Sequence, residues 1–123
     1  MKPIKQLSLL AACLLFSACD INNDMRALSA NKENSDARII AADNGCMGCH
    51  SVANKIVGPA WKRVSQRYQN IPDARDLLIA KIKSGGKGNW DNETGGKIMP
   101  GFEGKMSETE IAILVDYILK LSK

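Results

Sequence analysis

The sequence predicts an all-α fold of about four short helices. Apolar residues recur at helical spacing in four separate stretches, and segments that are rich in glycine or contain proline lie between these stretches. No stretch shows the two-residue alternation of a half-buried β-strand for long enough to predict a strand. We therefore expect one small domain of helices that pack against each other.

The first two predicted helices lie on either side of a segment rich in turn signals. One is short and covers residues 36–42, because its apolar residues are followed by Asn44-Gly45, a stop signal. The other follows the turn Val57-Gly58-Pro59. Its apolar face is formed at i, i+3 and i+7 by Trp61, Val64 and Tyr68.

The last two predicted helices carry clearer end signals. Pro72 and Asp73 suit the first turn of the third helix, and Gly85 suits its end. Ser107 and Glu110 form a capping box, in which each side chain satisfies a free amide at the start of the fourth helix. The buried faces are formed by Leu77, Leu78 and Ile82 in the third helix and by Ile111, Leu114, Val115 and Ile118 in the fourth.

Residues 1–18 have the layout of a secretory signal peptide. Lys2 and Lys5 precede an apolar run at residues 7–16, and small residues precede Cys19. The run is too short to span a bilayer unaided, so we expect cleavage rather than a retained transmembrane helix. The mature protein is expected in the periplasm.

The end of this segment resembles a bacterial lipoprotein signal, in which small residues precede a cysteine that receives lipid and becomes the new N-terminus. Cys19 is the expected lipidation site and membrane anchor, although Phe16 departs from the usual smaller aliphatic residue. Leu10-Ala11-Ala12-Cys13 fits the pattern better but leaves only a few apolar residues after Lys5. The alternative is an ordinary signal peptidase cut nearby, which leaves a soluble periplasmic protein.

Residues 19–35 are rich in asparagine, serine and charged residues and show no sustained apolar stripe, so they predict a flexible polar tether. Residues 36–123 remain for the folded domain, a size at which burial of apolar surface alone gives marginal stability. The formal net charge of +4 falls to +2 once residues 1–18 and their two lysines are removed. That charge is too small to indicate binding of nucleic acid.

Cys46-Met47-Gly48-Cys49-His50 is the C-x-x-C-H pattern that attaches haem covalently. Two thiols three positions apart project from the same side of one helical turn, so both can form thioether bonds with the vinyl groups along one edge of a porphyrin. His50, the only histidine in the chain, follows directly and is expected to bind the iron. The motif predicts one covalent haem c.

Three other interpretations of this motif each lack something that they need. A thioredoxin-like dithiol needs a β-α-β context, which the flanking segments do not predict. A zinc site needs further ligands, but neither a cysteine nor a second histidine follows His50. A structural disulfide between Cys46 and Cys49 leaves the adjacent histidine unexplained.

Four segments follow one another in a characteristic order and spacing: Gly45–His50, Val57–Trp61, Ile82–Trp90 and Ile98–Pro100. Taken together, they resemble the small bacterial class I cytochromes c, in particular the short cytochromes c551 and c552 and cytochrome c5-like proteins. The resemblance covers residues 36–123 and implies a cytochrome c fold wrapped around the haem. Residues 91–97 are the main departure, a polar insertion with two glycines that predicts a more mobile loop before Met99.

The resemblance also implies the groups around the haem. Met99 is expected to place its sulfur on the iron opposite His50, and a neutral sulfur ligand raises the reduction potential relative to two histidines. The Pro59 carbonyl is expected to accept the other N–H of the imidazole, and Trp90 to donate its indole N–H to a haem propionate. The alternatives are Met106 or water on the iron, a plain turn at Pro59 and a simple core ring at Trp90.

With both sides of the iron occupied, no position is open for oxygen, peroxide or substrate. The expected function is therefore transfer of single electrons between redox proteins that dock transiently, by a monomer without enzymatic activity. Several lysines are expected either to steer docking to acidic partners or to keep the protein soluble. They lie at positions 55, 62, 83, 87, 97 and 105. The alternative function is a haem-based gas sensor or a small peroxidase-like enzyme with a labile Met99.

Overall fold

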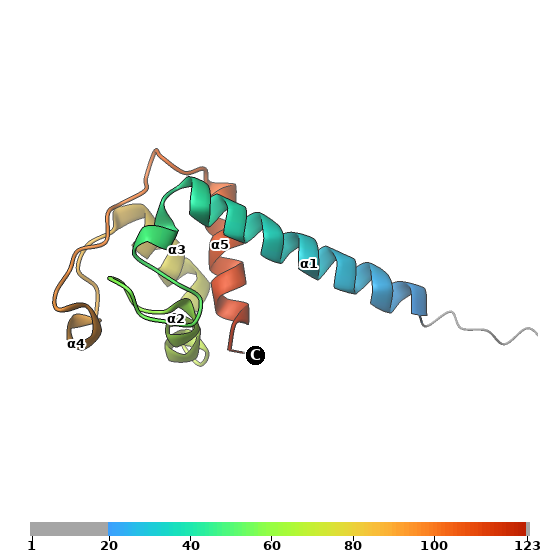
Figure 1. The fold of residues 1–123 in the computed structure, drawn as a ribbon, viewed down its shortest axis with the longest axis horizontal. Helices are drawn as coiled ribbons and strands as arrows, with labels where there is room; N and C mark the ends of the chain where they lie inside the picture. Colours follow the sequence, from blue (N-terminus) through green and yellow to red (C-terminus); the bar gives the residue numbers. More distant parts are fainter. Residues whose placement is uncertain (1–19, 123) are drawn as a thin grey trace, which may run out of the picture.

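The computed structural model describes residues 20–122, so the expected signal peptide 1–18 and the lipidation site Cys19 lie outside the described residues. Within them the chain forms five α-helices and one short 3-10 helix, η1 (Figure 1). The elements are α1 Asp20–Asp43, η1 Cys46–Gly48, α2 Trp61–Tyr68, α3 Ala74–Ser84, α4 Asp91–Thr94 and α5 Glu108–Lys120. Between residues 20 and 122 the only β pairing consists of two isolated bridges, and the all-α prediction is confirmed.

Helix α5 is the centre of the domain. Helices α1, α2 and α3 all pack against it, as Figure 1 shows. Its buried face is the predicted one, and Ile111, Leu114 and Val115 are among the most completely buried side chains that the structure describes. The predicted capping box is present: Ser107 Oγ accepts the Glu110 N–H at 3.2 Å, and the Glu110 carboxylate accepts the Ser107 N–H at 2.8 Å.

Helix α1 differs from the prediction, which placed a helix only over residues 36–42 and a flexible tether before it. The helix runs continuously from Asp20 to Asp43, so the residues expected to form a tether are helical from 20 onward. The segment contains neither glycine nor proline, and an i,i+4 ion pair joins Lys32 to Asp36 at 2.6 Å. The sequence has no apolar stripe here because residues 22–32 are exposed, and a helix without a buried face needs no apolar residues at helical spacing.

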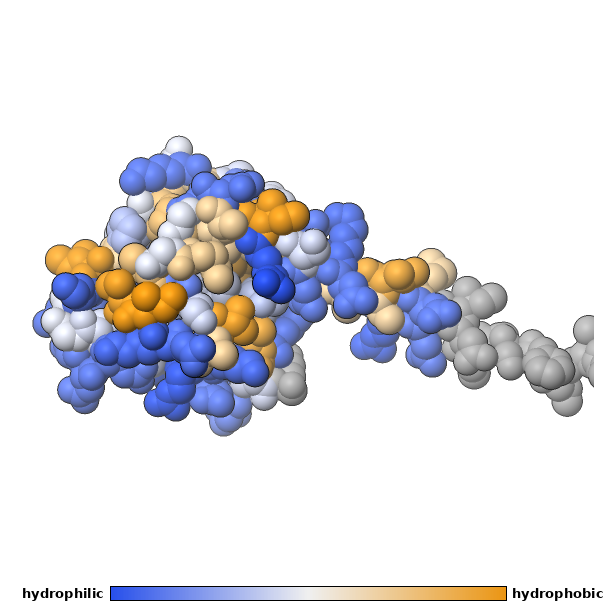
Figure 2. Space-filling model, viewed as in Figure 1, coloured by the Kyte–Doolittle hydropathy of each residue, from blue (hydrophilic) through white to orange (hydrophobic). Residues whose placement is uncertain are grey.

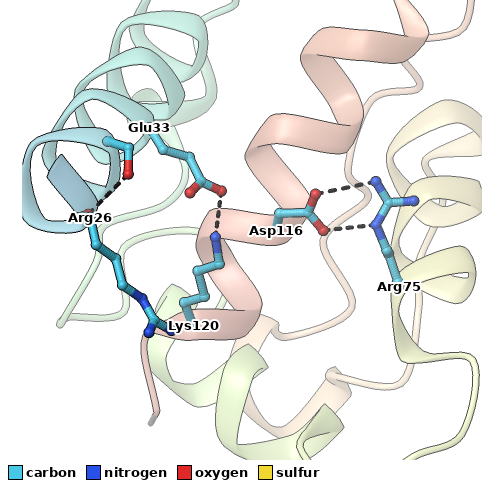
Figure 3. A network of polar contacts seen from close by, with 6 residues as sticks. Arg26, Glu33, Arg75, Asp116 and Lys120 are labelled. Atoms are coloured by element: carbon cyan, nitrogen blue, oxygen red, sulfur yellow. Dashed lines mark hydrogen bonds and ion pairs between the residues drawn. The ribbon is translucent and has the colours of Figure 1, made fainter. Parts of the chain in front are cut away.

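Contacts on two sides of α5 fix its neighbours. Helix α1 meets the core through fully buried small residues, Ala37 and Ala41. Figure 3 shows Glu33 of α1 paired with Lys120 of α5 at 2.5 Å. It also shows Asp116 of α5 accepting two hydrogen bonds from Arg75 of α3, at 2.7 and 3.2 Å. Exposed ion pairs of this kind contribute little stability each, and these two join α5 to α1 and to α3.

The surface divides into a projecting part and a compact part. Figure 2 shows a mostly hydrophilic surface along the projecting half of α1, and apolar side chains gathered on the compact part. Large exposed apolar side chains of the compact part include Ile56, Val57, Ile71, Leu77 and Ile98. Among the described helices, none combines the length and the apolar character needed to cross a membrane.

Candidate haem-binding site

A cavity of about 570 Å³ lies between α2, α3, α5 and the loops that join them. Its wall is largely apolar and includes Val64, Leu78, Ile82, Phe102, Leu114 and Ile118. Every haem-site residue expected from the sequence lines it, namely Cys46, Cys49, His50, Pro59, Trp90 and Met99. The fold therefore brings the C-x-x-C-H motif and the expected second ligand to one cavity, although they are far apart in the chain.

The two cysteines follow the end of α1 through a sharp turn. Gly45 reverses the chain in the left-handed conformation (φ 72°), which glycine adopts readily, and η1 follows. The His50 N–H donates to the Cys46 carbonyl at 2.9 Å, so the three motif residues lie on one turn. Both thiols are free, as thioether attachment requires. Partial burial raises the pKa of the Cys46 thiol, although a backbone hydrogen bond acts against this effect.

His50 is held from two directions. Its Nδ1 lies 2.8 Å from the Pro59 carbonyl oxygen, and this is the contact that the resemblance implied. In the tautomer whose Nδ1–H donates this hydrogen bond, Nε2 remains available to bind a metal. The ring also stacks on Trp61, with the ring centroids 6.1 Å apart and the ring planes inclined by 23°. The protein itself therefore fixes the orientation of the imidazole.

Gly58 makes this placement possible. A Cβ atom at residue 58 would lie 2.9 Å from each nitrogen of the His50 ring, so any larger residue would displace the ring. The N–H groups of Val57 and Gly58 both donate to the Cys49 carbonyl, at 3.2 and 2.7 Å, and hold the loop against the motif. Local sequence patterns predict only a turn at Gly58, because they do not reveal which side chain a glycine will face in the fold.

Met99 lines the cavity from a separate loop. Its backbone pairs with Gly86 through two hydrogen bonds of 2.8 and 3.2 Å. Gly85, at φ 65°, packs so closely that an added Cβ would lie 2.5 Å from the Met99 carbonyl oxygen. Met106, the alternative ligand, is 6% exposed in the core and does not line the cavity. The structure thus brings Met99, and not Met106, to the cavity, and its ligation of iron stays a prediction.

Trp90 lines the cavity at the start of the insertion and is partly buried. The Arg67 guanidinium lies 4.5 Å from its ring centroid. The insertion itself contains one turn of helix, α4, which ends at Gly95 in the left-handed conformation. The expected hydrogen bond from Trp90 to a haem propionate stays a prediction.

The charged side chains that line the cavity are all basic: Arg67, Lys81, Lys87 and Lys97. Lys81 donates to the Gly85 carbonyl at 2.8 Å, and Lys87 pairs with Asp91 at 3.4 Å. Lys87 and Lys97 are among the lysines expected near a haem edge, whereas Arg67 and Lys81 are not. Sequence patterns assign Arg67 to a polar helix face and Lys81 to a helix end, and only the packed arrangement of α2 and α3 brings them to the cavity.

These residues fit a haem c. Two free thiols, an oriented imidazole and a thioether meet in a cavity with an apolar wall, which suits a large planar ring with covalent attachment points. The same part of the chain, residues 20–122, contains no group of three or more histidine, cysteine or acidic residues that could hold a metal ion. The described residues therefore give no support to the zinc alternative.

A family model described as cytochrome c matches residues 36–122. The chain belongs to the cytochrome c family. Cytochrome c-551 of Allochromatium vinosum is 39% identical over 83 residues, which cover 68% of this chain and 83% of the relative. Cytochrome c-551 of Azotobacter vinelandii is 40% identical over 75 residues, which cover 61% and 84%.

Solved structures agree with this assignment. The crystal structure of Nitrosomonas europaea cytochrome c552 superposes with a TM-score of 0.60 at 37% identity, over 68% of this chain and 98% of that one. The class 1 cytochrome MtoD of Sideroxydans lithotrophicus ES-1 gives a TM-score of 0.61 at 30% identity, over 72% and 96%. The small cytochrome c fold is therefore confirmed, and the family match begins within α1, after its exposed half.

The family supplies the cofactor and the general chemistry. Cytochromes c bind one covalent haem c, so haem c is the cofactor of this chain, and their chemistry is electron transfer through that haem. The resemblance to the short cytochromes c551 and c552 is confirmed by relatives of those names.

Proposed function

We propose that this cytochrome c is a periplasmic one-electron carrier whose haem iron is bound by His50 and Met99. One observation carries the proposal: His50, held by Pro59, and Met99, held by Gly86, line the same apolar cavity as the two cysteines. The cavity thus offers one imidazole and one thioether, a pair of axial ligands found in cytochromes c.

Each side chain has a separate role. Cys46 and Cys49 form the thioether bonds that keep the cofactor in place through repeated cycles of reduction and oxidation. Pro59 accepts the Nδ1–H of His50, which keeps Nε2 unprotonated and correctly aimed. Met99 favours ferrous iron, and the apolar wall excludes water, so both raise the reduction potential. When bound, haem c supplies the reversible exchange of one electron.

The basic residues of the cavity support docking to redox proteins. Arg67, Lys81, Lys87 and Lys97 line it without an acidic residue among the described lining, although Asp91 pairs with one of them. A positive potential at this site favours acidic partner surfaces and speeds transient encounter. With two protein ligands on iron, substrate has no open position, so the protein acts as a carrier rather than as an enzyme.

The same proposal includes export and a lipid on Cys19, supported by the signal-like sequence of residues 1–18. Mass spectrometry of the mature N-terminus tests it directly. We expect a lipidated Cys19 at the new terminus, and we expect Cys19→Ser to release the protein from membranes while Cys13→Ser leaves it bound. An unlipidated terminus would mean a soluble periplasmic carrier.

Spectroscopy of the matured protein tests the ligation. We expect the ferric form to show the sulfur-to-iron charge-transfer band and Met99→Ala to abolish it. Met106→Leu is the matched control, because Met106 lies in the core away from the cavity and the change conserves volume. We expect the reduced protein to bind carbon monoxide only slowly, because Met99 must first leave the iron. Rapid binding by the unmodified protein would overturn the carrier function and favour a gas sensor or a peroxidase-like enzyme.

A further inference from the structure

We infer that Arg63 and Arg67 are positioning residues that clamp the insertion before Met99 and thereby keep the methionine on the iron. This inference rests on the proposed His50/Met99 ligation. The two arginines are one helical turn apart on α2, so their side chains project from the same face. Both reach the segment that contains α4, one at its start and the other within it.

Arg67 holds the start of the insertion with two contacts. Its Nη1 donates to the Asn89 carbonyl at 2.8 Å, and its guanidinium lies 4.5 Å from the Trp90 ring centroid. The Trp90 carbonyl in turn accepts the N–H groups of Glu93 and Thr94, each at 2.8 Å, and so begins α4. Arg67 therefore fixes the residue on which the helical turn of the insertion is built.

Arg63 holds the same insertion at a second point. Its Nη2 lies 3.4 Å from Glu93 Oε1, and the Glu93 side chain is 29% exposed. The contact is longer than the 2.8 Å hydrogen bond of Arg67 and is not accompanied by a cation–π contact, so we expect it to contribute less. Together the two contacts restrain both the position and the rotation of α4 relative to α2.

The clamp matters because few polar contacts restrain this segment, although Trp90 packs against the apolar core. Gly86 and Met99 pair at its base, and the backbone hydrogen bonds within residues 87–98 are all local. In the part of the chain that the structure describes, every hydrogen bond or ion pair from residues 87–98 to another element involves Arg63 or Arg67. Figure 1 shows α4 at the edge of the domain, on an extended loop away from α1. Segments with so few restraints open more readily than the core.

Two glycines make the Met99 end sensitive to this restraint. Gly95 and Gly96 both have positive φ, 61° and 75°, and they connect α4 to the residues that lead into Met99. Glycine rotates more freely than other residues, so the backbone that leads into Met99 can change conformation when α4 is not held. The contacts of the two arginines therefore restrain a loop whose own sequence is flexible.

The test uses the matured haem protein and its arginine variants. For Arg67→Gln we expect carbon monoxide to bind the reduced form about tenfold faster than in the unmodified protein, as loss of one charge-assisted hydrogen bond implies. We also expect a weaker sulfur-to-iron band and faster amide hydrogen exchange across residues 87–98. For Arg63→Gln the expected rate increase is about threefold. Arg67→Lys should fall between Arg67→Gln and the unmodified protein, since it keeps the charge but not the planar fork.

Lys62→Gln is the matched control, because it removes one positive charge from an exposed position on the same helix. The clamp is overturned if the arginine variants match this control in band intensity, carbon monoxide binding and amide exchange while the unmodified protein keeps its band. That result leaves the proposed function intact. Absence of the band in the unmodified protein overturns both the proposed ligation and the clamp.

Discussion

The two sides of the haem cavity are restrained in different ways. On the histidine side, backbone hydrogen bonds to the Cys49 carbonyl and the Pro59 contact hold His50 within one compact segment. On the methionine side, a long loop is closed at its base by pairing with Gly86, and beyond that point its polar contacts to another element come from side chains of α2. The first arrangement is local in sequence, whereas the second is assembled by tertiary structure.

This difference indicates where the protein opens first. A ligand held by several short-range backbone bonds exchanges only when its whole segment unfolds, whereas a ligand on a weakly restrained loop exchanges through local motion. In the proposed carrier, the iron–sulfur bond of Met99 is therefore the adjustable contact, and the His50 bond is the permanent one. Substitutions that act on one side alone test this difference.

The largest effect is expected at Gly58. Gly58→Val places side-chain atoms where the His50 ring lies, so the ring moves away from Pro59 or the loop shifts. Overpacking of this kind costs about 3 kcal/mol of unfolding free energy, and we also expect a large loss of matured haem protein. Gly48→Ala is the control, since an added Cβ there meets nothing within 4 Å. Normal haem content and stability in Gly58→Val would show that the histidine side is not rigid.

A smaller effect is expected at Gly85, on the methionine side. Gly85→Ala strains a backbone at φ 65° and pushes a Cβ into the Met99 and Gly101 backbones, each 2.5 Å away. We expect a loss of about 2 kcal/mol and a weaker sulfur-to-iron band with unchanged haem content. Gly104→Ala has similar backbone strain (φ 73°) but no nearby atom, so it should cost only about 1 kcal/mol. Equal spectra in the two variants would contradict the assigned position of the Met99 loop.

Local patterns were sufficient for the elements whose signals are contained in a short segment. The C-x-x-C-H motif, the capping box at Ser107 and the apolar face of α5 are each encoded within a few turns, and the structure has the helix and its cap as expected. The six expected haem-site residues also meet at one cavity, as the resemblance implied. What their atoms do with iron and propionate stays a prediction.

The features that the sequence did not predict have a common physical cause. The helical conformation of residues 20–35 was not predicted because sequence periodicity detects burial, and α1 buries only its later residues. Gly58 and Arg67 were missed because their importance depends on partners brought near by the fold, His50 in one case and Trp90 in the other. Such contacts have no signature in the neighbouring sequence.

The helix cap at Ser107 gives a milder test of the methionine side. The loop that carries Met99 continues into α5, and Phe102 accepts backbone N–H groups from Lys105 and Met106 just before the cap. Ser107→Ala removes one partner of the capping box, so we expect a loss of about 1 kcal/mol in chemical denaturation. The haem content and the His50 contact should not change. A drop in haem content would mean that the two sides are coupled more tightly than their contacts indicate.

The smallest expected effect is a dependence of the unfolding free energy on pH, which arises at the same end of α5. Hydrogen bonding to Lys83 lowers the pKa of Glu108, and hydrogen bonding to Ser107 lowers the pKa of Glu110. Because both pKa values are depressed by folding, their stabilising effect is complete above the ordinary carboxyl value of 4.5 and is lost as the pH falls through the lowered values. Glu108→Gln with Glu110→Gln should flatten the acid limb of a plot of unfolding free energy against pH. Asp24→Asn is the control, since it removes a carboxylate from the projecting part of α1, and it should leave the acid limb as it is in the unmodified protein. If the double variant also keeps that acid limb, these two carboxylates do not stabilise the methionine side.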